Sequence, residues 1–179
     1  MRKAENPLIV LSGSYDTLSI APQMGKGLNA ASGLMAINDI ARTFGTLLDD
    51  AGLKSSAKYD LMFILTPGAG VNYEATNTFL DALSSKIAER IQFVLCLDHL
   101  ASEGPLTLHV GSTSGEEQES FAKATLKLMK QVASLTNTQV SFAKKFTAGN
   151  FYEFEHLRYS EHGIVAATLT SLSQKKFAH

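Results

Sequence analysis

The sequence of 179 residues contains no tryptophan, one cysteine and four prolines, and it has neither a charge surplus nor a long apolar run. With 16 Lys and Arg against 17 Asp and Glu, the formal net charge is −1. A nucleic-acid-binding domain needs a basic surplus to displace counterions from phosphates, so this balance argues against that class. The apolar runs are far shorter than the roughly 20 residues that a membrane-spanning helix needs, and residues 1–7 lack the apolar centre of a signal peptide. We therefore expect the polypeptide as given to be soluble.

Cys96 is the single cysteine, so an intrachain disulfide is excluded. It lies within the apolar run 93–97, which favours a thiol that packs as a small hydrophobic group. Hydrophobic residues make up 45% of the chain and charged residues 18%, as is typical of a packed domain rather than a disordered or fibrous chain. A chain of this length is expected to form a single core. We divide it into a flexible N-terminus at 1–5, one domain at 6–172 and a C-terminal tail at 173–179.

Short apolar runs alternate along the chain with segments of helical periodicity, the pattern of an α/β protein. We expect Ser32 to cap the first helix, Gly52 to end it and His162 to be the C-terminal residue of the last helix. The fold predicted by this order is a three-layer α/β/α sandwich with a largely parallel, mixed sheet. The expected strands are 8–11, 59–65, 91–97, 106–110, 140–143 and 164–169, and the expected helices are about 32–52, 73–90, 116–135 and 152–161.

The residues after the predicted strands are the candidates for a functional site, because ligands of open α/β sheets bind at the carboxyl ends of the strands. These positions are occupied by 14–16, by the Pro- and Gly-containing loop 66–70, by Asp98 with His99, and by the loop that leads to Glu155.

Two segments at these positions resemble the M28 family of zinc aminopeptidases. They are the run Ile9 to Asp16 (IVLSGSYD) and the sequence Asn29 to Gly33 (NAASG) at the start of a helix. Four later segments are similar to the nicastrin- and nicalin-like branch of this superfamily: NYEAT at 72–76, FVLCLD at 93–98, LTLHV at 106–110 and EHLRY at 155–159. The resemblance extends from about residue 6 to residue 172 and implies an M28-like fold.

The active enzymes of that family bind two zinc ions through two His, a bridging Asp, a Glu and a further Asp, with a second Glu as the general base. Two adjacent dications repel each other, so they need a bridging carboxylate and about three protein ligands each. The resemblance places the first ligand His on Ser14, the bridging Asp on Leu28 and the two glutamates near Ala69 and Gly70. None of these four residues can replace the residue it stands for. The final ligand His would fall at 171–173.

Two carboxylates of the family's site are retained. Asp98 stands at the vestigial position of a ligand Asp, and Asp16 stands where an Asp would orient the first ligand His. One carboxylate does not form a zinc site, so the resemblance implies no metal, no cofactor and no catalytic residue in this chain. We expect Asp16 to serve instead as a turn or capping residue at the end of a strand.

For the histidines we favour structural roles over catalytic or metal-binding ones. If the strand continued through His99, its side chain and that of the preceding aspartate would point to opposite faces. His109 lies in an alternating strand with one wetter face and is expected to face solvent or a neighbouring side chain. For His156 we expect a structural role, with Arg158 and Glu161 of the same helix as polar partners at close spacing.

Other chemistries remain as alternatives. A zinc aminopeptidase with relocated ligands would need Asp98, His99, Glu74 and either His156 or His162 to converge, and a peptide-binding groove without turnover is a third possibility. Gly68 and Gly70 lack the third glycine of a dinucleotide-binding loop. A hydrolase triad built on Ser14 and Asp16 lacks the Gly-x-Ser-x-Gly elbow. The aromatic stretch at 142–154 is expected to be core rather than a partner surface.

The resemblance to the nicalin-like branch implies a non-catalytic scaffold that acts through protein–protein contacts. It implies a lumenal domain of a protein of the endoplasmic reticulum membrane, with the nodal modulator protein and a multi-pass membrane protein as partners. The processes implied are biogenesis of membrane proteins at the translocon, receptor assembly and Nodal signalling. Members of the branch carry an upstream lumenal region and a membrane helix, so we expect this chain to be a fragment that contacts neither nucleic acid nor membrane itself.

Overall fold

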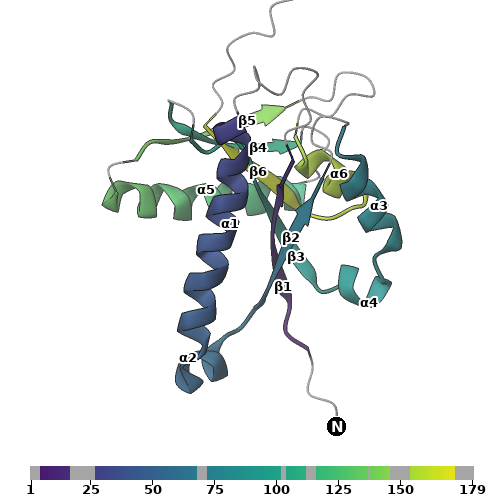
Figure 1. The fold of residues 1–179 in the computed structure, drawn as a ribbon, viewed down its shortest axis with the longest axis vertical. Coiled ribbons are helices and arrows are strands. Elements are labelled where there is room, and N and C mark those ends of the chain that lie inside the picture. Colours follow the sequence, from purple (N-terminus) through teal and green to yellow (C-terminus); the bar gives the residue numbers. More distant parts are fainter. Residues whose placement is uncertain are drawn as a thin grey trace, which may run out of the picture.

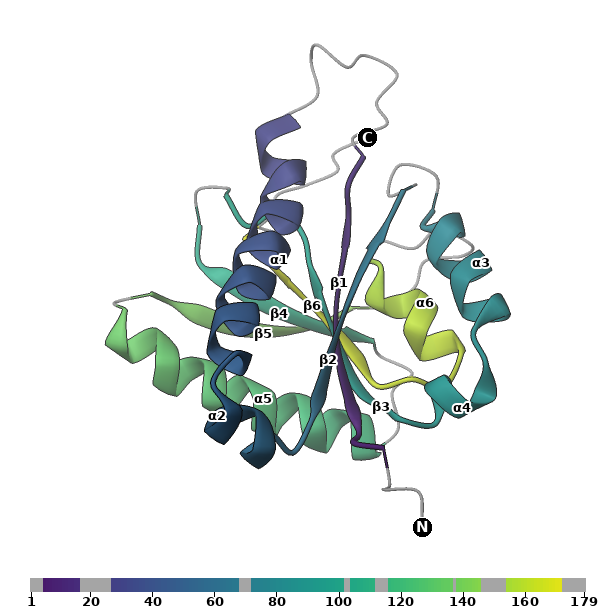
Figure 2. The same ribbon diagram turned by 60° about the horizontal axis from the view of Figure 1, so that its bottom comes forward.

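A computed structural model describes residues 5–16, 27–67, 72–101, 104–111, 116–136, 138–145 and 154–171 of the chain. These residues form a six-stranded sheet with helices on both faces (Figures 1 and 2). The strands are β1 (Leu8–Ser14), β2 (Asp60–Thr66), β3 (Ile91–Leu97), β4 (Leu106–Gly111), β5 (Val140–Lys145) and β6 (Ala166–Thr170). The helices are α1 (Gly27–Leu48), α2 (Ala51–Ser56), α3 (Glu74–Ala82), α4 (Ser85–Ala88), α5 (Glu116–Leu135) and α6 (His156–Glu161).

The strand order is β2-β1-β3-β6-β4-β5. Every neighbouring pair is parallel except β4 and β6, which run antiparallel. Figure 2 shows α1 and α5 on one side of the sheet and α3, α4 and α6 on the other. The predicted three-layer α/β/α fold with a largely parallel, mixed sheet is therefore confirmed.

Both faces of the central strands are buried, which is why β3 is apolar at every position except the exposed Gln92. Successive side chains of a strand point to opposite faces. Val94 and Cys96 accordingly pack with α3 and α6, in the cluster that contains Leu80 and Tyr159. On the other face, Phe93, Leu95 and Leu97 contribute to two clusters under α1 and α5, with Ile37, Leu126 and Met129 among the contacting helical residues.

The Ser32–Gly33 pair fastens α1 to the end of β3, and this differs from the predicted capping role of Ser32. The helix begins five residues earlier, at Gly27. Within the helix, the Ser32 hydroxyl accepts hydrogen bonds from the backbone N–H groups of Leu100 (2.7 Å) and Ala101 (3.3 Å). At Gly33, a Cβ atom would lie 2.1 Å from the carbonyl oxygen of Leu97. The small residues of this motif thus permit a close approach of helix and strand.

Two other helix boundaries also differ from the predictions. Helix α1 ends at Leu48, and Gly52 lies inside α2, where its N–H donates to the Asp50 carboxylate that caps this helix (2.8 Å). The predicted helix 73–90 is two helices, α3 and α4, because Leu83 and Ser84 have extended backbones between them. At the carboxyl end, α6 starts at His156, and residues 152–153 of the predicted helix lie outside the described part of the chain.

Candidate functional site

The carboxyl edge of the sheet brings three predicted positions together. The parallel register pairs Ser14 with Thr66, at the ends of β1 and β2. It pairs Ser12 with Cys96, so that Ser14 and Asp98 follow at the same level, two residues farther along β1 and β3. The side chain of Leu28, and both Ala69 and Gly70, lie outside the described residues, so their assignment as degenerate ligand positions stays a prediction.

Ser14 and Asp16 form a local side-chain contact at the end of β1. The Ser14 hydroxyl donates a hydrogen bond of 2.9 Å to Oδ1 of Asp16. The backbone N–H of Tyr15 donates to the carbonyl of Thr66 at 3.2 Å, which continues the pairing of β1 with β2. This contact shows neither a turn nor a cap, so the predicted role of Asp16 stays a prediction.

Asp98 and His99 form a partly exposed pair directly after β3. Nδ1 of His99 lies 2.6 Å from Oδ1 of Asp98. The condition under which these side chains would point to opposite faces is not met, because the strand ends at Leu97 and His99 adopts a left-handed backbone with φ of 46°. The hydrogen bond to Asp98 raises the pKa of His99 above its ordinary value, against the effect of burial. Ser171, after β6, fixes this loop by donating its N–H (3.1 Å) and its hydroxyl (2.6 Å) to the carbonyl of His99.

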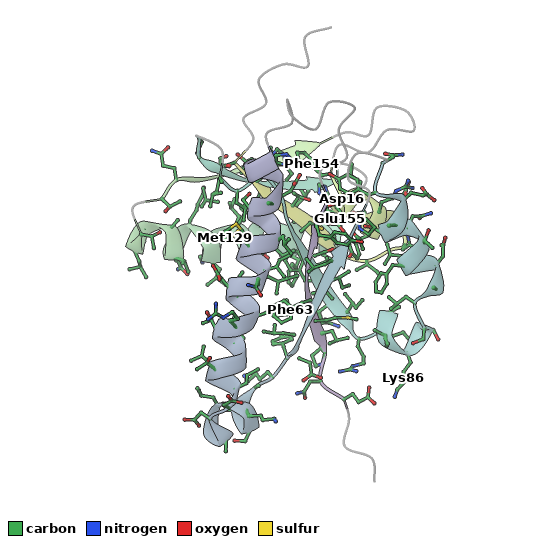
Figure 3. The ribbon with its side chains drawn as sticks, viewed as in Figure 1. Asp16, Phe63, Lys86, Met129, Phe154 and Glu155 are labelled. Atoms are coloured by element: carbon green, nitrogen blue, oxygen red, sulfur yellow. The ribbon has the colours of Figure 1, made fainter. Side chains whose placement is uncertain are left out.

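Beneath this edge, Glu155 is the centre of a buried hydrogen-bond network. Its Oε1 accepts bonds from three hydroxyl groups: those of Ser12 (2.7 Å), Thr76 (3.0 Å) and Thr66 (3.3 Å). The Tyr159 hydroxyl donates to Ser12 at 2.9 Å. Burial raises the pKa of Glu155, while the hydroxyl donors oppose that shift. The network joins α3 and α6 to the ends of β1 and β2, and Figure 3 shows Glu155 and Asp16 at the same end of the sheet.

A stack of three rings lies under α6. His109 is buried and stacks on Phe154 with ring centroids 4.5 Å apart, and Phe154 stacks on His156 at 5.9 Å. His109 was expected to face either solvent or a neighbouring side chain, and it faces a neighbouring side chain, that of Phe154. The prediction that one face of this strand is more solvent-exposed is wrong at His109, which is buried. Nδ1 of His156 bonds to Oγ1 of Thr168 at 2.8 Å, and its Nε2 has no hydrogen-bond partner among the described residues. Burial, together with His109, lowers the pKa of His156 to about 3.

Arg158 was expected to pair with His156, and this prediction is wrong. Its guanidinium instead donates two hydrogen bonds to the carbonyl of Asn72 (3.1 and 2.9 Å) and one to the Glu74 carboxylate (3.0 Å). Asn72 and Tyr73 have left-handed backbones, with φ of 62° and 55°. Arg158 therefore holds the strained entry of α3, the helix that follows β2.

His162 is the residue at which α6 ends, as predicted. Its Nδ1 lies 3.0 Å from the carbonyl oxygen of Arg158, and its Nε2 lies 3.1 Å from the carboxylate of Asp81 in α3. These polar neighbours raise the pKa of His162 above its ordinary value, although burial acts in the opposite direction. The residue joins two helices on the surface and does not approach the sheet edge.

The donor set does not form a metal centre within the described parts of the chain, where no three His, Cys, Asp or Glu side chains are placed to hold an ion. Of the residues that a relocated zinc site would need, Asp98 and His99 are in contact. Glu74 is bonded to Arg158, and His156 is buried against Thr168. No helix in the described ranges is long and apolar enough to cross a membrane.

Sequence analysis predicted the edge positions but not the network beneath them. The only signal in the sequence is that small hydroxyl residues, Ser12, Thr66 and Thr76, occur at positions where the surrounding pattern calls for apolar side chains. Such residues are compatible with a core when a polar partner satisfies them. The partner, Glu155, is 79 or more positions away in the sequence.

No protein-family model matches the chain. Among curated proteins it is similar to BOS complex subunit NCLN, or nicalin, from several vertebrates. It is 31% identical to the Mus musculus protein over 180 residues and 29% identical to the Danio rerio protein over 180 residues. Each match covers 95% of this chain and 31% of the relative, so the chain spans about a third of the length of these relatives. The resemblance to the nicalin-like branch is therefore confirmed over nearly the whole chain.

Among solved structures, the chain is similar to zinc aminopeptidases of the M28 type. The zinc aminopeptidase BSAP from Bacillus subtilis superposes with a TM-score of 0.66 at 14% identity, covering 98% of this chain and 39% of that one. The aminopeptidase from Aneurinibacillus sp. strain AM-1 gives 0.65 at 18% identity, covering 95% and 36%. A glutaminyl cyclase from an Acidobacteriales bacterium gives 0.60 at 15% identity, covering 98% and 58%. These identities show the fold alone, and a fold with more than one named activity does not decide the function.

Proposed function

We propose that this chain is a peptidase-like domain without catalytic activity, which acts as a protein-interaction scaffold in a membrane-protein complex. The curated relatives are named as subunits of the BOS complex, which supports a role in an assembly. The fold supports descent from a hydrolase framework, because the solved structures of similar fold include zinc aminopeptidases. The function then depends on surfaces rather than on a reaction at the sheet edge.

The observation that carries the proposal is the chemistry of the carboxyl edge. The resemblance assigns Ser14 to the position of the first ligand His, and the Ser14 hydroxyl is bonded to Asp16. The carboxylate of Asp98 is bonded to His99, which competes with a metal ion for this oxygen. A catalytic zinc ion needs about three protein ligands from among imidazole, carboxylate and thiolate groups. One carboxylate and one imidazole, already bonded to each other, are too few.

The finer assignments extend the resemblance to the nicalin-like branch. They place the domain on the lumenal side of the endoplasmic reticulum membrane, in the biogenesis of multi-pass membrane proteins at the translocon. The partners would be the nodal modulator protein and a multi-pass membrane protein, and the further processes would be receptor assembly and Nodal signalling. Co-purification of tagged full-length protein with these partners, compared with a variant that lacks this domain, tests the assignment directly.

The enzymatic alternative is a zinc aminopeptidase with relocated ligands. Titration of the purified chain with zinc by isothermal calorimetry, followed by an assay with leucine p-nitroanilide, separates it from the scaffold. The scaffold predicts no saturable zinc binding tighter than about 0.1 mM and no turnover above buffer. Binding of about two zinc ions per chain with chelator-sensitive turnover would establish the enzyme instead.

A further inference from the structure

Strand β2 lies at one end of the sheet and pairs with β1 alone. The N–H of Asp60 donates to the carbonyl of Pro7 at 2.9 Å, and the carbonyl of Thr66 accepts from the N–H of Tyr15 at 3.2 Å. The N–H and C=O groups of one residue point to the same side of a strand, and the side alternates along it, so the even-numbered residues of β2 face β1. The backbone groups that point away from the sheet are those of Leu61, Phe63 and Leu65, which we call the β2 edge. No hydrogen bond to these groups occurs within the described ranges.

The side chains of the β2 edge form an apolar row that is incompletely covered. They share one face of the sheet, because alternate residues of a strand point the same way. Phe63 packs against the cluster under α1 that contains Ile37, whereas Leu65 is 43% exposed. Figure 2 shows β2 between the helix layer that contains α1 and the layer that contains α3. The β2 edge thus combines unpaired backbone groups with apolar side chains beside them.

The sequence of β2 lacks the features that protect exposed edges. Natural edge strands usually carry lysine, proline or a bulge, which prevents pairing with another chain. The strand at the opposite end of the sheet, β5, has two lysines among its six residues. In contrast, β2 reads DLMFILT, and its register with β1 is continuous. Its only charged side chain, Asp60, is bonded to Arg90 at 2.7 Å. This composition favours the addition of a further strand.

We infer that the β2 edge binds β2 of a second copy of this chain in antiparallel orientation, which joins the two sheets into one. Unpaired N–H and C=O groups along a strand are recognised by another extended strand, so they select this kind of occupant over a helix or a small molecule. The strand β2 itself meets the requirement. A twofold axis beside Phe63 pairs Phe63 with Phe63 of the second copy, and Leu61 with Leu65 of the second copy.

This register satisfies the whole β2 edge. Each of the three residue pairs exchanges two hydrogen bonds, whereas a shift by two residues leaves one residue of the β2 edge unpaired in each copy. Leu61 of the second copy covers the exposed Leu65, and apolar pairs of this kind stabilise a sheet. Asp60 lies opposite Thr66 of the second copy rather than opposite another carboxylate. The interface is small, so we expect a dissociation constant of about 10–100 µM. The inference goes beyond the proposed scaffold function and does not depend on it.

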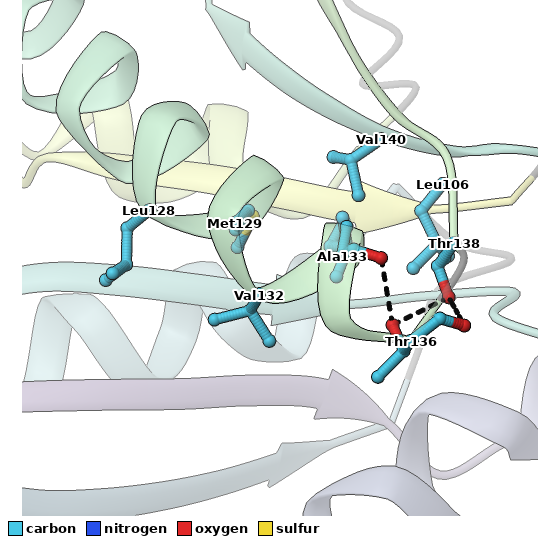
Figure 4. A pocket seen from close by; sticks show the side chains of 9 residues that line it. Leu106, Leu128, Met129, Val132, Ala133, Thr136, Thr138 and Val140 are labelled. Carbon is cyan, nitrogen blue, oxygen red and sulfur yellow. Dashed lines mark hydrogen bonds between the residues drawn. The ribbon is translucent and has the colours of Figure 1, made fainter.

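A second apolar surface supplies a matched control. Figure 4 shows a groove of about 310 Å³ between α5 and the sheet, with Leu128 and Val132 on the helix side. Its strand residues, Leu106, Val140 and Leu169, belong to β4, β5 and β6, so the groove lies away from β2. Val132 is 55% exposed and resembles Leu65 in size and polarity. A substitution at Val132 therefore introduces the same change at a surface without the proposed role.

Sedimentation velocity of the intact chain from about 1 to 300 µM measures the association. A monomer–dimer equilibrium is expected. Leu65→Lys should weaken the dimer at least about tenfold, because lysine is a residue that protects natural edges, and Val132→Lys should leave it unchanged. Leu65→Pro should also weaken it, since proline removes an outward N–H and keeps every hydrogen bond to β1.

Disulfide formation tests the register. Facing residues of a hydrogen-bonded antiparallel pair have Cα atoms about 5.5 Å apart, a distance that a disulfide can bridge. An equimolar mixture of Leu61→Cys and Leu65→Cys chains should form a disulfide-linked dimer on oxidation. Each variant alone should not, because neither position faces itself across the axis. The wild-type chain is the control for Cys96, which is buried.

Several outcomes would overturn the inference. They are a chain that stays monomeric up to about 1 mM, a dimer that Leu65→Lys and Leu65→Pro do not weaken, and cross-linking of the single variants equal to that of the mixture. A dimer that only Val132→Lys abolishes would assign self-association to the groove by α5. A monomeric chain that binds a synthetic strand peptide at the β2 edge would assign this edge to another polypeptide. Urea unfolding would verify that each variant is folded.

Discussion

The Ser12 hydroxyl donates a hydrogen bond of 2.7 Å to the carboxylate of Glu155, which lies 143 positions later in the chain. This bond connects the middle of the buried strand β1 to the residue before α6, directly beneath the edge at which M28-type enzymes would carry their metals. A buried carboxylate that accepts bonds from three hydroxyl groups has a structural role in this position, since it is the acceptor for Ser12 and for the Thr66 and Thr76 hydroxyls, which also lie 2.9 Å from each other. The framework of the sheet edge is thus held by polar contacts that need no metal.

Removal of the Glu155 carboxylate should destabilise the fold. Glu155→Ala removes the acceptor of the Ser12 hydroxyl, leaves Thr66 and Thr76 only their contact with each other, and creates a cavity, so we expect the free energy of unfolding in urea to fall by about 3 kcal/mol. Glu155→Gln keeps a carbonyl acceptor and should cost clearly less. Glu89→Ala, at an exposed glutamate after α4, is the control and should change stability by less than about 0.5 kcal/mol. Equal losses for Glu155→Ala and Glu155→Gln would contradict the role of the acceptor.

The burial of His156 predicts a loss of stability in mild acid. Its folded-state pKa of about 3 lies below the unfolded value of 6.5, so the unfolded state takes up the proton first. The stabilising contribution is present above pH 6.5 and is lost as the pH falls toward 3. Between pH 6.5 and pH 5 the loss is about 2 kcal/mol.

Urea unfolding at several pH values measures this effect, and His156→Gln should remove most of the slope. His99 and His162 have raised pKa values and affect stability only above this pH range. Their stabilising contributions are fully present below pH 6.5 and are lost as the pH rises through their folded-state pKa. The pKa of Glu155 is also raised, so its contribution to stability is likewise lost as the pH rises above the unfolded value of 4.5. A slope unchanged in His156→Gln would show that another group causes the acid sensitivity.

Substitution by alanine should have opposite effects on stability at two glycines of α1. At Gly33 the new Cβ would lie 2.1 Å from the backbone carbonyl of Leu97, so α1 must shift and we expect a loss of about 2–3 kcal/mol. At Gly45 the new Cβ meets nothing within 4 Å, and the higher helix propensity of alanine should stabilise the protein by about 0.5–1 kcal/mol. Thermal unfolding of the two variants checks both signs, and a stabilising Gly33→Ala would refute the close packing of α1 on β3.

The strands could be predicted from the sequence because their cause is local. The segment 91–97 is apolar except for the exposed Gln92, and its predicted boundaries agree with those of β3. The break between α3 and α4 could not be predicted in the same way, since Leu83 and Ile87 keep helical spacing across it and both pack against the same cluster. The pattern of apolar residues continues although the backbone does not.

The candidate site shows a second limit of the sequence. A serine that caps a helix and a serine within a helix that accepts bonds from a distant loop have the same local sequence, so Ser32 was assigned the wrong role. The contact of His99 with Asp98 depends on a left-handed backbone that the residue type does not indicate. Long-range partners such as Glu155 and Ser12 become neighbours only through the packing of α6 on the sheet.

The central claim is that the carboxyl edge of the sheet, between Ser14 and Asp98, does not bind the paired metal ions of an aminopeptidase. Crystals grown with excess zinc and measured at the zinc absorption edge test it most directly. The account predicts no anomalous density at this edge, with Asp98 still bonded to His99. Two anomalous peaks about 3.5–4 Å apart beside Asp98 would contradict it.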